Sequence, residues 1–541
     1  MTPVLVLALT ALLILSWLRL LVLDGLRALH ILQLEEYQTV RYWRWLIGHR
    51  DRTVNGVLAA TALAIMLISL IAPPALAAVA AIGGIGAGIE RSWRVRRPAA
   101  KKPLVLTARA RRLLAGWILC SLLIGGGVLV GVRSWASGPS SVLVGGTAAV
   151  LVLTLLTWPL MSAANLVLYP VEAFLRRYYL QSARRVLRST SPIVIGVAGS
   201  YGKTSTKSFL AQILGRREKV LATPRSFNTP MGLCRVIRES LEPDHRIFIA
   251  ELGTYRRGEI RQLCRLVEPR IGVLTAVGPE HLERFGSMED VRRAEFELIE
   301  ALPPDGLAVV NGDDETCREF AARARCQCLL AGGPPHPNRT IWAEEIELTS
   351  DGLRFVLCLH DGRRAAVATP LLGRHNVSNI LLAAAVALHQ GFDLPDLVAA
   401  IACLEPVEHR LQPIRNASGI VVIDDTYNSN PRGAAGALEV LATFRGGRRY
   451  LVTPGMVELA DFQDQAHRDL GRQAARVCDG VILVGPRQTR AIAEGLLEAG
   501  FDQDRLIVVR DLAEATERLK TLLAPGDVVL FENDLPDTYD E

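Results

Sequence analysis

Hydrophobic positions follow two different patterns, one in residues 1–165 and another in the rest of the chain. The first part contains long apolar runs: Val4 to Leu23, Val57 to Ile89, Leu113 to Val132 and Ser141 to Met161. Each is long enough for a helix that crosses a bilayer, which takes about 20 residues. Pro73-Pro74 interrupts the second run, which predicts either two helices joined by a tight turn or one kinked span. We therefore expect an α-helical transmembrane region with about five spans.

Basic residues orient these spans. Nine Lys and Arg residues and no acidic one lie between Arg91 and Arg112, whereas the loop from Arg133 to Ser140 carries only Arg133. Because Lys and Arg collect on the cytoplasmic side, the first loop is expected inside and the second outside. The chain is then a multi-pass protein of the cell membrane, and everything after residue 165 is cytoplasmic. The basic loop fits a role in topology alone, and it also fits binding of anionic membrane lipid.

A short basic segment follows the last span. Arginine pairs at Arg176-Arg177 and Arg184-Arg185 stand among apolar residues between Val171 and Arg188. This pattern predicts an amphipathic helix at the membrane surface, so residues 166–190 form a linker to the soluble part.

From residue 191 onward, short apolar runs alternate with helical stretches. Four runs read as buried strands: Ile193 to Val197, Arg246 to Ala250, Ile271 to Thr275 and Leu307 to Asn311. This alternation predicts an α/β domain with a largely parallel sheet in residues 191–408, and Thr340 to Ala368 reads as an antiparallel patch. Five more strand-like runs between Ile420 and Phe531 predict a second, Rossmann-like α/β domain in residues 409–541.

Composition adds three limits. A chain of 541 residues is long enough for several domains. Its nine cysteines form no C-x-x-C pair and fit no zinc pattern, which favours free thiols in a reducing compartment. The formal net charge of +6 comes largely from local basic segments, so it does not indicate a nucleic-acid partner.

The clearest chemical motif lies between a predicted strand and a predicted helix, Thr206 to Leu214. It reads Gly199-Ser-Tyr-Gly202-Lys203-Thr204-Ser205. Glycines let backbone N–H groups approach phosphate oxygens, the helix start adds partial positive charge, and the lysine adds a point charge. Thr204 is then placed to hold magnesium. Val197 occupies the position of the first glycine in the full phosphate-loop pattern, and a purely structural turn is the alternative interpretation.

Eight motifs in order resemble the Mur ligases, the ATP-dependent amide ligases of peptidoglycan synthesis, and most of all the MurF branch of that family. They are Gly199-x-x-Gly-Lys-Thr, Asn228-Thr, Glu251-Leu-Gly with Gly258-Glu-Ile, His281-Leu-Glu-Arg-Phe-Gly-Ser, Asn311-x-Asp-Asp, Gly373-Arg-His-Asn376, His409-Arg410 and Asp424-Asp-Thr-Tyr-Asn-Ser-Asn-Pro431. The resemblance runs from about residue 191 to about residue 520.

The resemblance implies a function and a site. A carboxylate would attack ATP to give an acyl phosphate, which an amino acid or dipeptide would then convert to an amide. Both steps gather negative charge, which a lysine, arginines and magnesium can stabilise. The implied roles are these: Gly199, Gly202, Lys203 and Ser205 at the phosphates, Thr204 and Glu251 on one magnesium, His281 on a second, Asn376 at the nucleotide, Arg410 at the γ-phosphate and Asp425 at the ribose.

The chain departs from the family in three places. Glu295 stands where many members carry a carbamylated lysine, so its carboxylate is expected to hold the second magnesium directly. The amino-terminal domain that grips the UDP-sugar substrate is replaced by the membrane spans. The end of the chain, from Asn533, is acidic where a basic Lys-Gly-Ser segment is usual in the MurF branch.

Several other functions fit parts of the sequence. Within the ligases, the acid could be a lipid-linked precursor or a poly-γ-glutamate chain. An ATP-driven transporter would fit the spans and the phosphate loop, but no Leu-Ser-Gly-Gly-Gln signature follows it. A pseudoenzyme scaffold is disfavoured because Lys203, Thr204, Glu251 and Arg410 are all present.

Overall fold

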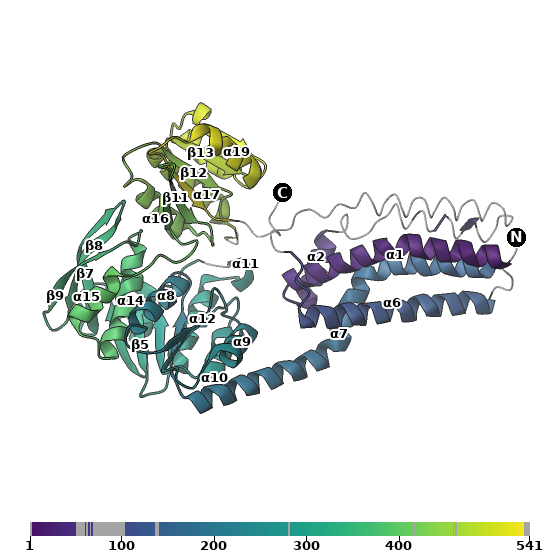
Figure 1. Ribbon diagram of the computed structural model, residues 1–541, viewed down its shortest axis with the longest axis horizontal. Coiled ribbons are helices and arrows are strands. Elements are labelled where there is room, and N and C mark those ends of the chain that lie inside the picture. The colour runs from purple at the N-terminus through teal and green to yellow at the C-terminus, as the bar shows by residue number, and fades with distance from the viewer. Residues whose placement is uncertain are drawn as a thin grey trace. The chain divides into compact units, whose positions relative to one another are not determined.

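The computed structural model describes residues 3–49, a few residues between 60 and 68, and residues 103–135, 140–279, 282–415, 417–457, 459 and 462–534. It divides into two compact units, Met1–Arg177 and Tyr178–Glu541, which we call the helical unit and the α/β unit (Figure 1). Each is described by itself.

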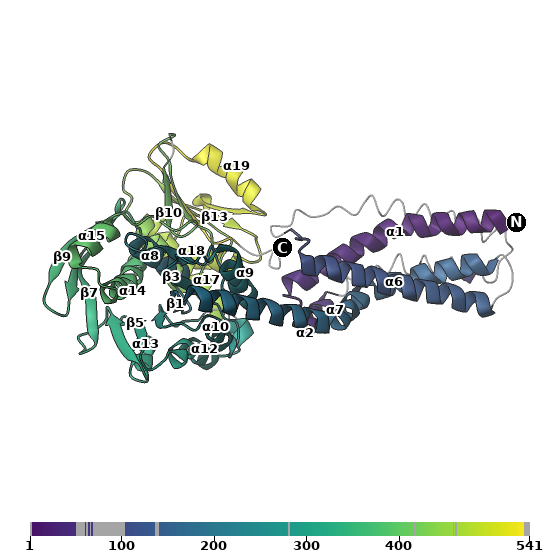
Figure 2. The same cartoon turned by 60° about the horizontal axis from the view of Figure 1, so that its bottom comes forward.

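The helical unit is built from long helices that lie side by side (Figures 1 and 2). Its described helices are α1 (Pro3–Leu34), α2 (Thr39–Gly48), α6 (Ala108–Trp135) and the first part of α7 (Ser140–Thr190). Each contributes to one core, with Leu29 from α1, Tyr42 from α2, Leu113 from α6 and Met161 from α7 fully buried. The expected all-helical region is confirmed over these residues.

Two of these helices are long and apolar enough to cross a membrane, Ala108–Ser134 and Val144–Thr190. They contain the predicted spans Leu113 to Val132 and Ser141 to Met161 almost completely. The predicted span Val4 to Leu23 lies inside α1, whereas nearly all of Val57 to Ile89 lies outside the described residues. The expected total of about five spans stays a prediction.

Aromatic residues join α2 to α7. The Tyr42 hydroxyl donates to the carbonyl of Trp158 at 3.1 Å, and the Trp43 indole donates to Ser162 Oγ at 2.9 Å. The rings of Trp45 and Trp158 stack with centroids 5.8 Å apart. Tyrosine and tryptophan are the residues that membrane proteins place at the boundary between lipid and water.

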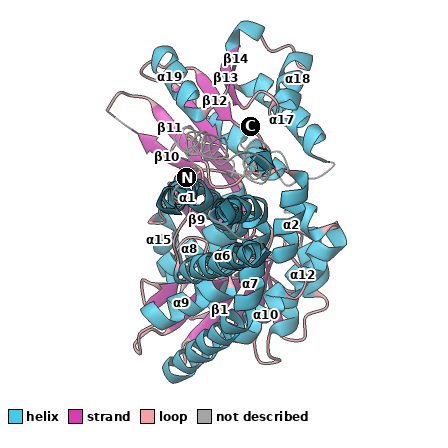
Figure 3. Ribbon diagram, turned by 90° about the vertical axis from the view of Figure 1, so that its right-hand side faces the viewer, coloured by secondary structure: helices cyan, strands magenta, loops and turns pink. Residues whose placement is uncertain are grey.

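The α/β unit contains two sheets with helices packed around them (Figure 3). The first has nine strands in the order β2-β3-β1-β4-β5-β6-β7-β8-β9. Their bounds are β1 Ile193–Ala198, β2 Val220–Ala222, β3 Ile247–Glu251, β4 Ile271–Leu274, β5 Leu307–Asn311, β6 Gln327–Ala331, β7 Arg339–Thr349, β8 Gly352–Leu359 and β9 Arg364–Thr369. Strands β1 to β7 run parallel to one another, whereas β8 pairs antiparallel with both β7 and β9. Both the parallel sheet and the antiparallel patch predicted from the sequence are confirmed.

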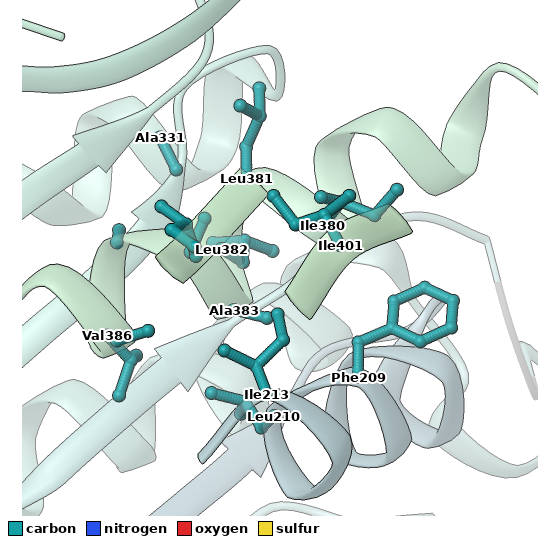
Figure 4. Packing of buried hydrophobic residues seen from close by; sticks show 14 of the residues in the cluster. Phe209, Leu210, Ile213, Ala331, Ile380, Leu381, Leu382, Ala383, Val386 and Ile401 are labelled. Carbon is teal, nitrogen blue, oxygen red and sulfur yellow. The ribbon is translucent and has the colours of Figure 1, made fainter. Parts of the chain in front are cut away.

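Eight helices accompany this sheet among the described residues. They are α8 Lys203–Leu214, α9 Pro230–Ser240, α10 Glu259–Val267, α11 Leu282–Phe285, α12 Met288–Ala301, α14 His375–His389 and α15 Leu394–Ala402, with the short α13 at Glu315–Ala321 beside β5 and β6. Side chains of α8 and α14 interlock in the main core, where Phe209, Leu210 and Ile213 meet Ile380 and Ala383 (Figure 4). This packing fixes the helix that starts at the glycine loop.

The second sheet has six strands in the order β10-β11-β15-β12-β13-β14. The strands are β10 Gln412–Arg415, β11 Val421–Asp425, β12 Arg449–Thr453, β13 Gly480–Val484, β14 Leu506–Val509 and β15 Val528–Glu532, and the helices are α16 Pro431–Leu441, α17 Gln463–Val477, α18 Arg490–Glu498 and α19 Leu512–Leu522. All pairs are parallel except β10 with β11. This is the predicted Rossmann-like domain.

All nine cysteines are free. Burial raises the pKa of Cys234 to about 11 and the pKa of Cys264 and Cys478 to about 12. Cys403, the residue directly after α15, is the one whose side chain is exposed. The expectation of unpaired thiols is confirmed.

A buried carboxylate holds two helices of the first α/β domain together. Glu297 on α12 accepts hydrogen bonds from the backbone N–H groups of Gly258, at 2.6 Å, and Arg261, at 3.0 Å. These N–H groups belong to the first turn of α10, where no carbonyl of the helix can reach them. Glu297 therefore caps α10 from a neighbouring helix.

We expect Glu297→Ala to loosen α10, because two N–H groups of its first turn would lose their capping acceptor at a cost of about 0.5–2 kcal/mol. Hydrogen exchange measured by mass spectrometry should show faster exchange in residues 258–262. Glu300→Ala is the matched control, since Glu300 lies on the same helix and makes an exposed ion pair with Arg261. Equal exchange in both variants would contradict the capping role.

Candidate active site

The loop after β1 has the backbone that a phosphate site needs. Gly199 and Gly202 adopt φ angles of +130° and +82°, which side chains other than hydrogen rarely allow. A Cβ on Gly199 would collide with Thr275, and one on Gly202 would collide with Asn379. The loop is thus held tightly from two sides, and α8 starts directly after it at Lys203. Thr204 and Ser205 follow in the first turn, where free N–H groups attract anions.

Lys203 folds back over the loop. Its Nζ donates to the carbonyls of Gly199 and Ser200, the second at 3.0 Å. The ammonium group is therefore kept at the mouth of the loop, where a phosphate would meet it.

Glu251 lies beside this loop because β3 and β1 are parallel neighbours, with Val197 opposite Glu251. Its carboxylate is buried and forms an ion pair with Lys207, with 2.8 Å between Nζ and Oε2. The other oxygen accepts from Asn228 Nδ2 at 3.2 Å. Sequence reasoning selected Glu251 and missed Lys207, although Lys207 follows Lys203 by about one helical turn and so had to lie on a related face.

A chain of polar side chains connects α8 to α14. Thr206 Oγ1 donates to Asn379 Oδ1 at 3.2 Å, Asn379 Nδ2 donates to Asn376 Oδ1 at 3.0 Å, and Asn376 Nδ2 donates to the carbonyl of Leu372 at 2.7 Å. The structure brings Asn376 toward the phosphate loop in this way. Asn379 is a contact that the motif search did not select.

Arg410 and Asp425 come together where the second α/β domain begins. The guanidinium of Arg410 stacks on the ring of Tyr427 at 4.1 Å, and Asp425 Oδ1 accepts from the N–H of Leu411 at 3.2 Å. Burial raises the pKa of Asp425 to about 6, and the nearby charge of Arg410 opposes that shift. The predicted γ-phosphate and ribose contacts are therefore neighbours.

A second carboxyl group, Glu532, ends the strand next to that of Asp425. It is buried and accepts hydrogen bonds from Ser429 and from Thr453 Oγ1, the second at 2.9 Å. Burial raises the pKa of Glu532 to about 7, and Asp425 adds to the shift. No motif marked Glu532, because its position is defined only by the folded sheet.

Glu295 lies on α12 with its side chain buried. The pKa of the Cys317 thiol on α13 is raised, first by burial, then by Asp314, and also by the charge of Glu295. The Glu295 carboxylate therefore lies near α13. His281 lies outside the described residues. A shared metal site of Glu295 and His281 stays a prediction.

An apolar cavity of about 460 Å³ lies between the two α/β domains. Met456, Leu459, Phe462 and Leu470 line it from the second domain, and Leu282 is among the residues that line it from the first. No Lys or Arg is present among its described lining residues, which include Asp469 as the single charged side chain.

A phosphate-binding loop, a buried carboxylate beside it and a second α/β domain that brings an arginine define a nucleotide-dependent enzyme. Residues 197–387 match the Mur ligase middle domain, and residues 409–532 match the Mur ligase glutamate ligase domain. The UDP-N-acetylmuramoyl-tripeptide–D-alanyl-D-alanine ligase of Mycobacterium leprae is 34% identical over 365 residues, which cover 63% of this chain and 70% of that enzyme. The chain belongs to the Mur ligase family.

Other relatives agree. The enzyme of the same name from Escherichia coli strain K12 is 33% identical over 62% of this chain and 74% of its own length. The crystal structure of MurF from Acinetobacter baumannii matches with a TM-score of 0.59 and 30% identity, covering 67% of this chain and 78% of that one. MurF from Thermotoga maritima, solved in complex with ADP, matches with a TM-score of 0.59 and 26% identity, over 66% of this chain and 80% of that one. This chain is accordingly an ATP-dependent, MurF-like ligase of peptidoglycan precursor synthesis, which rules out the transporter interpretation.

We expect Lys207→Met to destabilise the α/β unit by about 3–5 kcal/mol, because it leaves the buried Glu251 carboxylate without its partner. The double variant Lys207→Met with Glu251→Gln should recover part of that loss, since no buried charge remains unpaired. Thermal unfolding of the purified full chain measures both effects. Lys219→Met is the control, because Lys219 pairs with Glu242 and Asp244 at the surface and should matter by less than about 1 kcal/mol. A double variant less stable than Lys207→Met alone would contradict the pairing.

Stability should also depend on Glu532. Its folded-state pKa, about 7, lies above the ordinary value of 4.5, so the folded state binds the proton more tightly than the unfolded state. The contribution of Glu532 to stability is fully present below pH 4.5 and is lost as the pH rises from 4.5 through about 7. The total loss is at most about 3 kcal/mol.

Glu532→Gln should flatten the fall in melting temperature between about pH 5 and about pH 8, and should stabilise the protein at the upper end. Glu517→Gln, on the exposed pair with Lys520, is the control. A pH profile unchanged by Glu532→Gln would show that another group titrates.

Proposed function

We propose that this chain joins an amine-bearing substrate, first of all D-alanyl-D-alanine, to the free carboxylate of a muramoyl-tripeptide precursor, at the cytoplasmic face of the cell membrane. The observation that carries the proposal is the glycine loop with Lys203 beside the buried carboxylate of Glu251, in a chain that aligns with MurF enzymes over most of their length. The substrates are those that the names of the relatives state.

The chemistry has two steps. A carboxylate oxygen of the precursor attacks the γ-phosphorus of ATP, the bond to the bridging oxygen breaks, and ADP leaves. The amine nitrogen then attacks the acyl carbon, an amide bond forms, and inorganic phosphate and a proton are released. Lys203 stabilises charge on the phosphates, and Arg410 approaches the γ-phosphate from the second domain. Asp425 holds the ribose, and Asn376 contacts the nucleotide.

A threonine hydroxyl and carboxylates are ligands that suit Mg²⁺. Thr204 and Glu251 would hold one ion, and Glu295 and His281 a second. The ions supply positive charge at the phosphate oxygens. Lys207 pairs with Glu251 in this structure, which keeps the carboxylate oriented next to the loop.

The apolar cavity between the domains suits a small amine substrate with methyl side chains, such as D-alanyl-D-alanine. A second candidate for the acid is a lipid-linked precursor or another envelope polymer. The helical unit favours it, because two of its helices are long enough to span a membrane. Such helices would hold the enzyme at the membrane, where a lipid-linked acid is found.

The test is a reconstituted reaction with the full chain in detergent. ATP, D-alanyl-D-alanine and either a UDP-linked or a lipid-linked muramoyl-tripeptide are supplied, and phosphate release and product mass are followed together. Phosphate release that needs both substrates, with a product mass equal to their sum less one water, supports the function. Lys203→Ala should abolish turnover in a folded protein, because it removes charge at the phosphates. ATP hydrolysis without a new amide, or near-normal ligation by Lys203→Ala, would refute it.

We expect Glu295→Gln to raise the magnesium concentration that half-maximal activity requires and to slow acyl-phosphate formation, with ATP binding little changed. Wild-type activity should need no added bicarbonate, since no carbamate has to form. Glu300→Gln, an exposed residue on the same helix, is the matched control. Identical magnesium titrations for Glu295→Gln and the wild type would exclude the carboxylate from the metal site.

A further inference from the structure

Three arginines gather around one carboxylate in the helical unit, at the start of α6 and in the adjoining part of α7. Arg112 and Glu172 form a two-pronged ion pair, with Nε to Oε1 at 2.7 Å and Nη2 to Oε2 at 3.0 Å. Arg109, three residues earlier on α6, has its Nε 4.0 Å from Glu172 Oε2. In this two-pronged pair, both carboxylate oxygens of Glu172 accept hydrogen bonds from Arg112.

Arg109 is placed by neutral groups instead. Its guanidinium stacks on the ring of Tyr37 at 4.0 Å, and its Nη2 lies 3.5 Å from Asn165 Oδ1. Asn165 is itself held, because its Nδ2 donates to the carbonyl of Tyr37 at 3.1 Å and to Thr39 Oγ1 at 3.2 Å. The buried Nε of Arg109 donates no hydrogen bond within the described residues. Arg109 is therefore held in place. Its buried Nε is closed to a ligand, so the donors it keeps for one are the guanidinium N–H groups other than Nε and the one that Asn165 accepts from.

The charges in this cluster do not balance. Arg176, one helical turn beyond Glu172, is near enough for its charge to repel those of Arg109 and makes no ion pair with any described residue. Three guanidinium groups thus share one carboxylate. The side chains of Arg109 and Arg112 remain about one-third exposed, at 35% and 36%, whereas Glu172 is 13% exposed. An anion approaching from outside meets the arginines before it meets the carboxylate.

The position of the cluster also matters. Arg109 and Arg112 lie in the first turns of α6, directly before its apolar stretch from Leu113, and the helix start adds partial positive charge there. Trp43 of α2, on the same bundle, is exposed, and exposed tryptophans of membrane proteins collect at the boundary between lipid and water. With α6 entering the membrane at Leu113, the cluster would lie at the depth of the lipid phosphate groups.

We propose that Arg109, Arg112 and Arg176, with Tyr37 and Asn165 as positioning residues, form a binding site for the phosphate group of an anionic lipid. Arg109 and Arg176 supply the free donors, and the Arg112–Glu172 pair fixes the spacing of α6 and α7. A free phosphate ion has the same chemistry, and the test below separates the two sources. The site rests on the proposed membrane location and is independent of the ligase chemistry.

The test uses the full chain in detergent, with phosphatidylglycerol as the probe and phosphatidylcholine as the neutral reference. Native mass spectrometry counts the lipids that stay bound. The variants are Arg109→Gln, Arg176→Gln and the two together; Arg112 is left intact, because its loss would strand the Glu172 carboxylate. Arg133→Gln is the matched control, since Arg133 is exposed and lies in the last turn of the same helix.

We expect phosphatidylglycerol to bind in preference to phosphatidylcholine, and each substitution to weaken it about fivefold, the size expected for one arginine near a charged lipid surface. Arg133→Gln should leave it unchanged. Inorganic phosphate, added as competitor, should not displace the lipid at concentrations comparable with it. Equal loss in Arg133→Gln, no loss in the double variant, or displacement by inorganic phosphate would each overturn the proposal.

Two further measurements keep the result interpretable. The melting temperature shows whether each variant folds. If Arg109→Gln does not fold, Arg176→Gln alone tests the site, because Arg176 is exposed and unpaired among the described residues. ATP turnover by Arg109→Gln and by Arg176→Gln should match that of the wild type. Failure of lipid binding with normal turnover counts against this site alone, whereas absent turnover in the wild type counts against the proposed function.

Discussion

The carboxylate of Glu251 needs a counter-charge, and much of the α/β unit is arranged around that need. It ends a buried parallel strand at the sheet edge where the glycine loop turns into α8. Water cannot reach it, so an isolated negative charge there would cost several kcal/mol. Lys207 meets the need from α8, and the packing of α8 against α14 keeps Lys207 in place. The same packing sets Asn379 against Gly202, so core, loop and charge are positioned together.

Sequence motifs predicted those residues of the site whose spacing along the chain is set by their chemical role. The glycines and Lys203 stand in one short segment, and Glu251 follows a recognisable strand, so their proximity follows from the rule that parallel strands end at one edge. Lys207, Asn379 and Glu532 could not be found in this way. Each is defined by what another element brings to it, and no spacing along the chain encodes that.

The two glutamates of α12 show the same limit. Glu295 and Glu297 are two residues apart, and sequence reasoning assigned a role only to the first. The structure gives Glu297 a definite structural task at the start of α10, while Glu295 is buried elsewhere on the helix. The broad fold was more predictable, since strand lengths and the change to an antiparallel pattern depend on local alternation. Short strands such as β2 and β6 have weak patterns and were not predicted.

The distribution of the thiols has a practical consequence. Cys403 is exposed, whereas most of the other eight are buried within helices or sheets and ionise poorly where the pKa is raised. Only ionised, accessible thiols react readily with maleimide reagents. Cys403 lies six residues before His409, where the second Mur ligase domain begins. The natural chain therefore carries a site for a fluorescent label beside the boundary of its two Mur ligase domains, so changes at that boundary can be followed without engineering the protein.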